Sequence, residues 1–229
     1  MLIATSLAVA ALLSAPVASR PLGPSITANV TVAADIRPSL VARVLAETSA
    51  VWRLAGILLV WDRRAATVAD AGNGHPAAGA LAARPGGASL LSVTIGNEKQ
   101  TAARDPTVKA LGWIVFAAGS PQQEVYVSYA TALELFAESA GVVGRMETMT
   151  VTERETLIGR AMGRALAHEL GHYLLRSKVH APSGLMRARF TAAELFSGPR
   201  RGLELATEQQ RLIAALMSAT VPVAFATKN

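Results

Sequence analysis

The chain has 229 residues, of which 51% are hydrophobic and 17% are charged, and this balance excludes an intrinsically disordered protein. The net charge of +6 comes from scattered basic residues without dense basic runs or interleaved aromatic residues, so we expect no nucleic-acid partner. The sequence contains no cysteine, which excludes disulfides and thiolate metal ligands.

The first nineteen residues are almost all apolar or small and carry no charged side chain. This run is short for a membrane span, and it ends in the small residues that signal peptidase reads. We therefore expect a signal peptide over 1–19, a secreted or periplasmic protein, and no stable membrane insertion after cleavage. An uncleaved membrane anchor is the alternative. Residues 20–229 then form one domain, which we expect to be a monomer.

A strand, a helix and a second strand are predicted next. Residues 25–35 alternate apolar and polar side chains, which indicates a strand. Pro38 opens a helix with an apolar face, and the β-rich run 57–62 follows it. This order predicts a βαβ-like unit with a parallel strand pair. Residues 63–88 are rich in Ala, Gly and Pro and are expected to be a flexible loop, with His75 as a solvated loop residue.

The middle of the chain adds three predicted strands, at 90–96, 112–119 and 124–130. The last two read as a hairpin around Ser120-Pro121, followed by a short helix over 131–140.

Three capping boxes mark the starts of the later helices, because a Thr followed three residues on by Glu or Gln satisfies free N–H groups there. They predict a long helix over about 153–176, a short helix, and a final helix ending near 217. Their residues are Thr152 with Glu155, Thr191 with Glu194, and Thr207 with Gln210.

The long predicted helix carries the segment HELGH at 168–172. His168 and His172 are four residues apart and project from the same face, so both imidazoles can reach one zinc ion at ~2.0–2.1 Å. Glu169 stands one step around the helix, where its carboxylate can accept a proton from an activated water. The alternative is a helix that carries two histidines on its surface or with their partners in the core, since buried imidazoles need polar partners.

A catalytic zinc site normally has three protein ligands and one open position. His180 is the nearest candidate, provided that the chain turns back after about residue 176. Glu194 is the competing ligand, about twenty residues downstream of the motif, in a spacing that resembles the two-histidine, one-glutamate set of gluzincins such as thermolysin. Glu194 also has a second role available as the third helical residue of a capping box.

HELGH, then His180, then a turn ending in Gly-Leu-Met at 184–186 resembles the metzincin clan of zinc metalloproteases, whose pattern is H-E-x-x-H-x-x-G-x-x-H followed by a Met-turn. The resemblance implies a single α+β domain with a twisted mixed sheet, a long active-site helix and a small C-terminal helical part. It implies His168, His172 and His180 as Zn²⁺ ligands, Glu169 as general base and Met186 beneath the metal. Ordinary core packing is the alternative for Met186.

The sequence departs from that pattern at three positions. Leu175 stands where the pattern has glycine, Lys178 stands where it has the third histidine, and Ala188 stands where some members carry a tyrosine. His180 comes two residues late, which predicts a longer helix or a wider turn.

These features together predict a secreted zinc-dependent endopeptidase that cleaves a peptide or protein substrate. The clan's extended substrate would lie along an edge strand formed by 112–119 or 124–130. An exported zinc-binding or protein-binding module without turnover is the other hypothesis.

Overall fold

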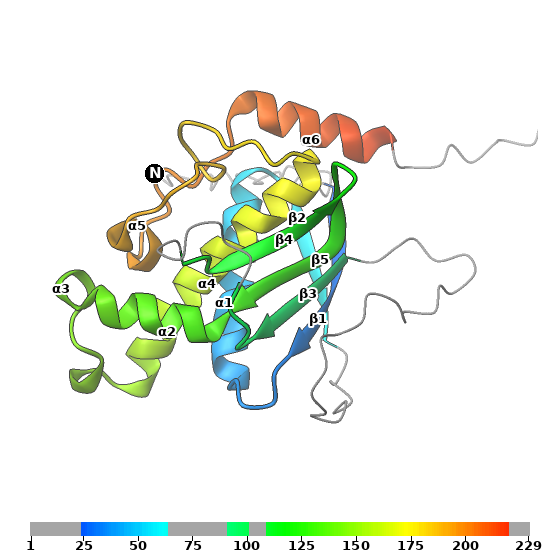
Figure 1. Ribbon diagram of the computed structural model, residues 1–229. Helices are drawn as coiled ribbons and strands as arrows, with labels where there is room; N and C mark the ends of the chain where they lie inside the picture. Colours follow the sequence, from blue (N-terminus) through cyan, green and yellow to red (C-terminus); the bar gives the residue numbers. More distant parts are fainter. Residues whose placement is uncertain (1–23, 64–90, 101–108, 220–229) are drawn as a thin grey trace, which may run out of the picture.

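Five strands form one mixed sheet in the computed structural model, which describes residues 24–63, 91–100 and 109–219 (Figure 1). The strand order is β2-β1-β3-β5-β4, in which β4 alone runs antiparallel to its neighbour. The α+β class expected from the sequence is confirmed. The strands are β1 (Ser25–Val32), β2 (Leu58–Asp62), β3 (Leu91–Gly96), β4 (Gly112–Ala117) and β5 (Ser120–Ser128).

The first two strands and the helix between them form the predicted parallel unit. Helix α1 (Pro38–Leu54) has proline in its first turn, where no N–H partner is needed, and β1 and β2 then pair in parallel from Ser25 opposite Leu58. Two predicted segments lie outside the described residues. They are the leader over 1–19 and residues 64–88 of the loop, which include His75. No helix in the described ranges is long and apolar enough to cross a bilayer.

Strands β4 and β5 form the predicted hairpin, but its turn is misplaced in the sequence prediction. Ser120 and Pro121 already belong to β5, and the turn consists of Ala118 and Gly119, which both have positive φ (48° and 82°). Two consecutive residues with positive φ are typical of the tight turns that match strand twist. The hairpin leaves β4 at the edge of the sheet.

Helix α4 (Val151–Leu175) is the longest element and starts earlier than predicted. Its capping box is Thr150 with Glu153, not Thr152 with Glu155. Both pairs have the required spacing, but the Glu155 carboxylate instead lies 3.7 Å from Arg37, which caps α1, and 4.0 Å from Arg43 within α1. The helix ends when Arg176 adopts the left-handed conformation (φ 49°).

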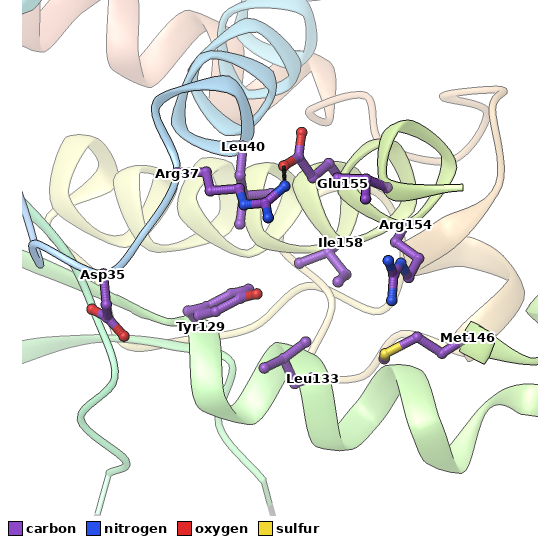
Figure 2. Close-up of a pocket in the computed structure, with 10 residues that line it drawn as sticks. Asp35, Arg37, Leu40, Tyr129, Leu133, Met146, Arg154, Glu155 and Ile158 are labelled. Carbon is purple, nitrogen blue, oxygen red and sulfur yellow. Dashed lines mark ion pairs between the residues drawn. The ribbon is translucent and has the colours of Figure 1, made fainter. Parts of the chain in front are cut away.

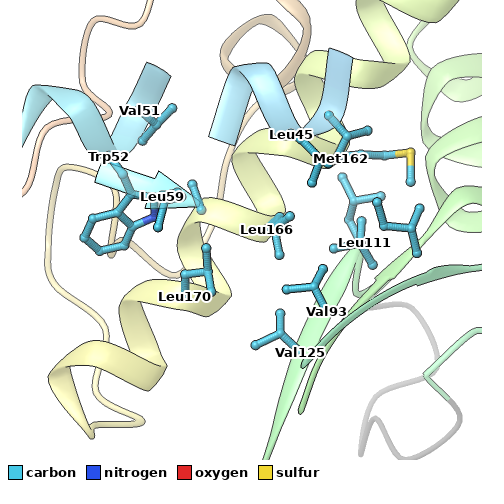
Figure 3. Packing of buried hydrophobic residues seen from close by; sticks show 14 of the residues in the cluster. Leu45, Val51, Trp52, Leu59, Val93, Leu111, Val125, Met162, Leu166 and Leu170 are labelled. Atoms are coloured by element: carbon cyan, nitrogen blue, oxygen red, sulfur yellow. The ribbon is translucent and has the colours of Figure 1, made fainter. Parts of the chain in front are cut away.

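One face of the sheet is buried beneath α1 and α4 (Figures 1 and 3). The alternate residues of each strand point to this face, as a period of two requires. They pack against apolar residues of both helices, among them the fully buried Trp52 of α1 and Leu166 of α4. The strand residues in this core include Ala28, Val30, Val93, Val125 and Val127.

Shorter helices complete the fold. The chain from β5 to α4 forms α2 (Tyr129–Glu138), α3 (Ala140–Val143) and the 3₁₀ turn η1 (Met146–Thr148). The expected C-terminal helical part consists of α5 (Ala192–Phe196) and α6 (Thr207–Ala219). The box predicted at Thr191 and Glu194 is confirmed, whereas the one at Thr207 is wrong: Thr207 is already helical, and the Gln209 side chain accepts from the backbone N–H of Ala206.

A buried ionic cluster joins α1, α4 and the segment after α5. Glu47 accepts a hydrogen bond from Arg164 Nε at 2.9 Å and another from Arg200 Nη2 at 2.6 Å. Glu47 and Arg164 are 5% and 1% exposed, so neither charge is compensated by water. The Arg164 guanidinium also donates to the backbone carbonyls of Glu194, Gly198 and Pro199.

Glu47→Gln is expected to lower the free energy of unfolding by about 3–5 kcal/mol, because it leaves buried guanidinium charge without its counter-ion. Urea denaturation measures this loss. The matched control is Glu138→Gln, which removes one exposed partner of Lys109 and should cost less than about 1 kcal/mol. Equal, small losses in the two variants would contradict the assignment of the cluster as a buried ionic anchor.

Candidate metal centre

Two histidines of α4 present the same ring nitrogen to one point. His168 Nδ1 lies 2.8 Å from the carbonyl oxygen of Leu185, and His172 Nδ1 lies 2.7 Å from that of Ser177. A carbonyl can only accept, so each Nδ1 donates and each Nε2 keeps its lone pair. The backbone thus sets the tautomer that a metal ligand needs.

The two free nitrogens face each other. His168 Nε2 and His172 Nε2 are 3.0 Å apart, and with both lone pairs directed inward they repel unless a cation lies between them. Two ligands at the usual zinc distance on one tetrahedral ion would be about 3.3 Å apart, which is close to this separation. Burial lowers the pKa of His168 to about 4 and also lowers that of His172, so neither ring takes up the compensating proton at neutral pH.

His180 completes the group from the turn that follows α4. Its ring centroid is 5.3 Å from that of His168 and 4.9 Å from that of His172. One ligand nitrogen from each of the three rings lies within 4.8 Å of the other two, so the group can hold a metal ion. His168 and His172 are buried, whereas His180 is exposed.

The two extra residues before His180 are accommodated without a glycine. Helix α4 continues through Leu175, and Arg176 supplies the left-handed conformation that glycine would normally provide. The chain then reverses, and the N–H of Ala181 donates to the carbonyl of Met186 at 2.7 Å. The spacing predicts a longer helix or a wider turn; the helix continues through position 175, where the family pattern has glycine, and residues 176–180 connect it to His180.

The side chain of Met186 packs against helix α4. It is fully buried, and a Cβ added to Gly171 would come within 2.1 Å of its sulfur. The turn before it contains Gly184 (φ 77°), and the N–H of Leu185 donates to the carbonyl of Glu204 at 3.0 Å. Gly171, the fourth residue of HELGH, is therefore required for close approach rather than for helix formation.

Gly171→Ala is expected to destabilise the fold by about 1–3 kcal/mol, because Met186 must leave its place in a packed core. Thermal or urea unfolding measures the change. Gly141→Ala in α3 is the matched control, since a Cβ there meets nothing within 4 Å, and it should be neutral or slightly stabilising. The packing account fails if Gly171→Ala is also neutral.

Glu169 lies beside the histidines in a cleft of about 300 Å³. The backbone N–H of Ile114 in β4 hydrogen-bonds its carboxylate, and burial raises the pKa of Glu169 to about 8. A Cβ on Gly112 would come within 3.1 Å of Glu169 Cγ, so the edge strand approaches this side chain closely. The cleft is lined by Gln100, Gly112, Trp113, Ile114, Phe116, Glu169, His172, Lys178 and His180.

The individual β4 residues and Lys178 were not predicted to line the site. The sequence signals for them are the prediction of 112–119 as one of two possible substrate edges and the position of Lys178, where the metzincin pattern has its third histidine. Of those two segments, β4 is at the edge of the sheet and β5 is inside it.

Glu194, the competing ligand, is not in the histidine group. Its carboxylate accepts a hydrogen bond from the backbone N–H of Thr191 at 2.8 Å and lies 3.0 Å from Arg187 Nη2. These contacts, the backbone hydrogen bond first, lower the pKa of Glu194. It serves as a helix cap and ion-pair partner.

A second cavity, of about 210 Å³, lies at the opposite end of α4 (Figure 2). Its α4 residues end at Ile158, ten residues and therefore about 15 Å along the helix from His168. Its lining combines apolar side chains with Asp35, Arg37, Arg154 and Glu155, and Glu155 is paired with Arg37 (Figure 2). The described residues around it include no histidine, so the metal centre is a separate site.

No protein-family model matches the chain, and no curated protein sequence matches it. Among solved structures it is similar to archaemetzincin from Methanopyrus kandleri, with a TM-score of 0.46 and 14% sequence identity over 88% of this chain and 99% of that one. A likeness this distant does not assign an activity. The function is therefore inferred from the chemistry of the site itself.

Proposed function

We propose that this chain is a zinc-dependent endopeptidase that hydrolyses peptide bonds with Glu169 as general base. One observation carries the proposal: three histidines converge on one point, and a buried carboxylate lies beside them in a cleft bounded by an edge strand. A metal site, a proton acceptor and a surface for an extended chain are what peptide hydrolysis by this route needs.

The donor set favours zinc among the common metals. All three ligands are imidazoles, which suit zinc, and three protein ligands leave a fourth position open for substrate or water. Bound zinc supplies Lewis-acid chemistry, because it polarises a carbonyl and lowers the pKa of a coordinated water toward ~7. His168 and His172 are held for this role by their hydrogen bonds to Leu185 and Ser177.

Glu169 is placed to hold and move one proton. Its pKa is raised by burial, and a cation held by the neighbouring histidines would favour the ionised form, which can accept a proton from the attacking water. The N–H of Ile114 keeps the carboxylate aimed into the cleft. The protonated carboxyl then donates to the leaving amine, so one residue serves both steps.

Strand β4 is the surface on which the substrate would bind. An edge strand offers unpaired N–H and C=O groups to an extended peptide, which adds to the sheet as a further strand. Because Gly112 and Ile114 border Glu169, a peptide bound along β4 passes the proposed base. We further propose that the domain spans 20–229, is exported by the leader at 1–19, acts as a monomer on peptides or proteins, and binds no nucleic acid.

Metal removal tests the proposal. The purified protein should contain close to one zinc per chain by elemental analysis and should cleave a mixed peptide library. A chelator should abolish cleavage, and added Zn²⁺ should restore it. Zinc-loaded protein that cleaves no peptide would instead support the second candidate, an exported zinc-binding module. Ala188 is the feature that favours this candidate, since it stands where some metzincins carry a tyrosine and offers no hydroxyl group there.

A further inference from the structure

Lys178 belongs to the cleft although it is not a metal ligand. It lies in the turn between α4 and His180, and its side chain lines the same cleft as Glu169 and His172. Its Nζ is 5.0 Å from the centroid of the Phe116 ring, which lies on the edge strand β4. Lys178 therefore reaches from the turn that carries His180 to β4, the strand that would bind substrate.

The ammonium group of Lys178 has no acidic partner among the described residues. Other lysines of the described chain are paired: Lys99 contacts Glu134, and Lys109 contacts Glu138. Glu169 and Lys178 are the two charged residues in the described lining of the cleft, and the Glu169 carboxylate is bonded to the backbone of β4. The Phe116 ring attracts the cation and leaves its N–H donors available.

The spacing along β4 relates the lysine to the reacting bond. Ile114 contacts Glu169, and Phe116, two residues on, contacts Lys178. The pairing of β4 with β5 shifts register between Ile114 and Phe116, so they are separated by at most roughly the 7 Å that two strand residues span, and an extended peptide covers this distance in about two residues. The ammonium group therefore lies about two residues along the peptide from the bond that Glu169 would serve.

We propose that Lys178 determines substrate specificity by binding a carboxylate of the peptide within about two residues of the cleaved bond. This inference rests on the proposed function and specifies its substrate class. The carboxylate is either an acidic side chain or the C-terminal carboxylate, because both present the same charged oxygens to an ammonium group.

Binding to a zinc-loaded Glu169→Ala variant tests the inference without cleavage. The probes are three alanine-based hexapeptides with an acetylated N-terminus. The first has a central Glu and an amidated C-terminus, and the second has Gln in place of the Glu. The third has the central Gln and a free C-terminus. By calorimetry, at least one of the two carboxylate peptides should bind about fivefold more tightly than the neutral peptide. This ratio corresponds to a free energy near the upper end for exposed ion pairs and below that for charge-assisted hydrogen bonds. A preference for the Glu peptide identifies the side chain, and a preference for the free C-terminus identifies the terminal group.

Lys178→Met in the same background should remove this preference, and Lys178→Glu should transfer it to a hexapeptide with a central Lys. Arg176→Met is the matched control: it removes a positive charge from the same turn but does not line the cleft, so the preference should persist. Equal binding of charged and neutral peptides, or an unchanged preference in Lys178→Met, would overturn the inference. Absence of cleavage by the wild type overturns the proposed function instead, and the affinities still decide the role of Lys178.

Discussion

Glu169→Ala is expected to lower kcat/KM for peptide cleavage by about 10²–10⁴-fold while leaving the zinc content unchanged. The carboxylate lies beside the histidine group but is not part of it, so its removal takes away the proton acceptor and no ligand. Cleavage of a fluorogenic peptide and elemental analysis of the same preparation measure the two quantities.

Glu169→Gln separates chemistry from shape in this experiment. Glutamine has nearly the same size and can still accept from the N–H of Ile114, but it cannot take up a proton at neutral pH. Both variants should therefore be equally impaired. Activity that survives in Glu169→Gln would assign the residue a positioning role, and loss of zinc in either variant would make it a ligand.

His180→Ala is expected to weaken zinc binding by more than about 100-fold. Loss of a residue that only orients a ligand through a hydrogen bond typically weakens binding by about 10–100-fold, and His180 is itself a proposed ligand. The two remaining histidines hold an ion with only two protein contacts, whereas zinc sites with an open position normally have three. Titration against a chromophoric chelator of known affinity measures the change. His180 is exposed, so its replacement should leave the free energy of unfolding of the metal-free protein almost unchanged.

Two variants control for this result. Glu194→Ala should bind zinc as the wild type does, because its carboxylate pairs with Arg187 and caps α5. His75→Ala removes the remaining histidine of the chain, which the sequence indicates is a loop residue. If His180→Ala binds normally and Glu194→Ala does not, the metal is held by two histidines and a glutamate.

Much of the site could be predicted from the sequence because it is local. Four-residue spacing on a helix is enough to place His168 and His172 on one face, and the βαβ unit follows from short-range periodicity. The local sequence pattern could not decide between two possible capping boxes that have the same spacing. Thr150 and Thr152 each precede a glutamate by three residues, and only the contact of Glu155 with α1 decides between them.

The cleft could not be predicted, because it depends on contacts between residues distant in sequence. Ile114 reaches Glu169 across 55 positions, and Phe116 reaches Lys178 across 62, with no motif linking either pair. The cluster of Glu47 and Arg164 joins residues 117 apart. Such contacts follow from how α1 and α4 pack on the sheet, which no single segment encodes.

The hydrogen bond that orients His168 has a consequence for the order in which the protein can mature. Its acceptor belongs to Leu185, whose own N–H is held by the carbonyl of Glu204. A nascent chain that has emerged only as far as HELGH has the ligand residues but not the backbone that orients them. The ribosome must therefore synthesise the chain beyond Glu204 before His168 can be held by these two hydrogen bonds.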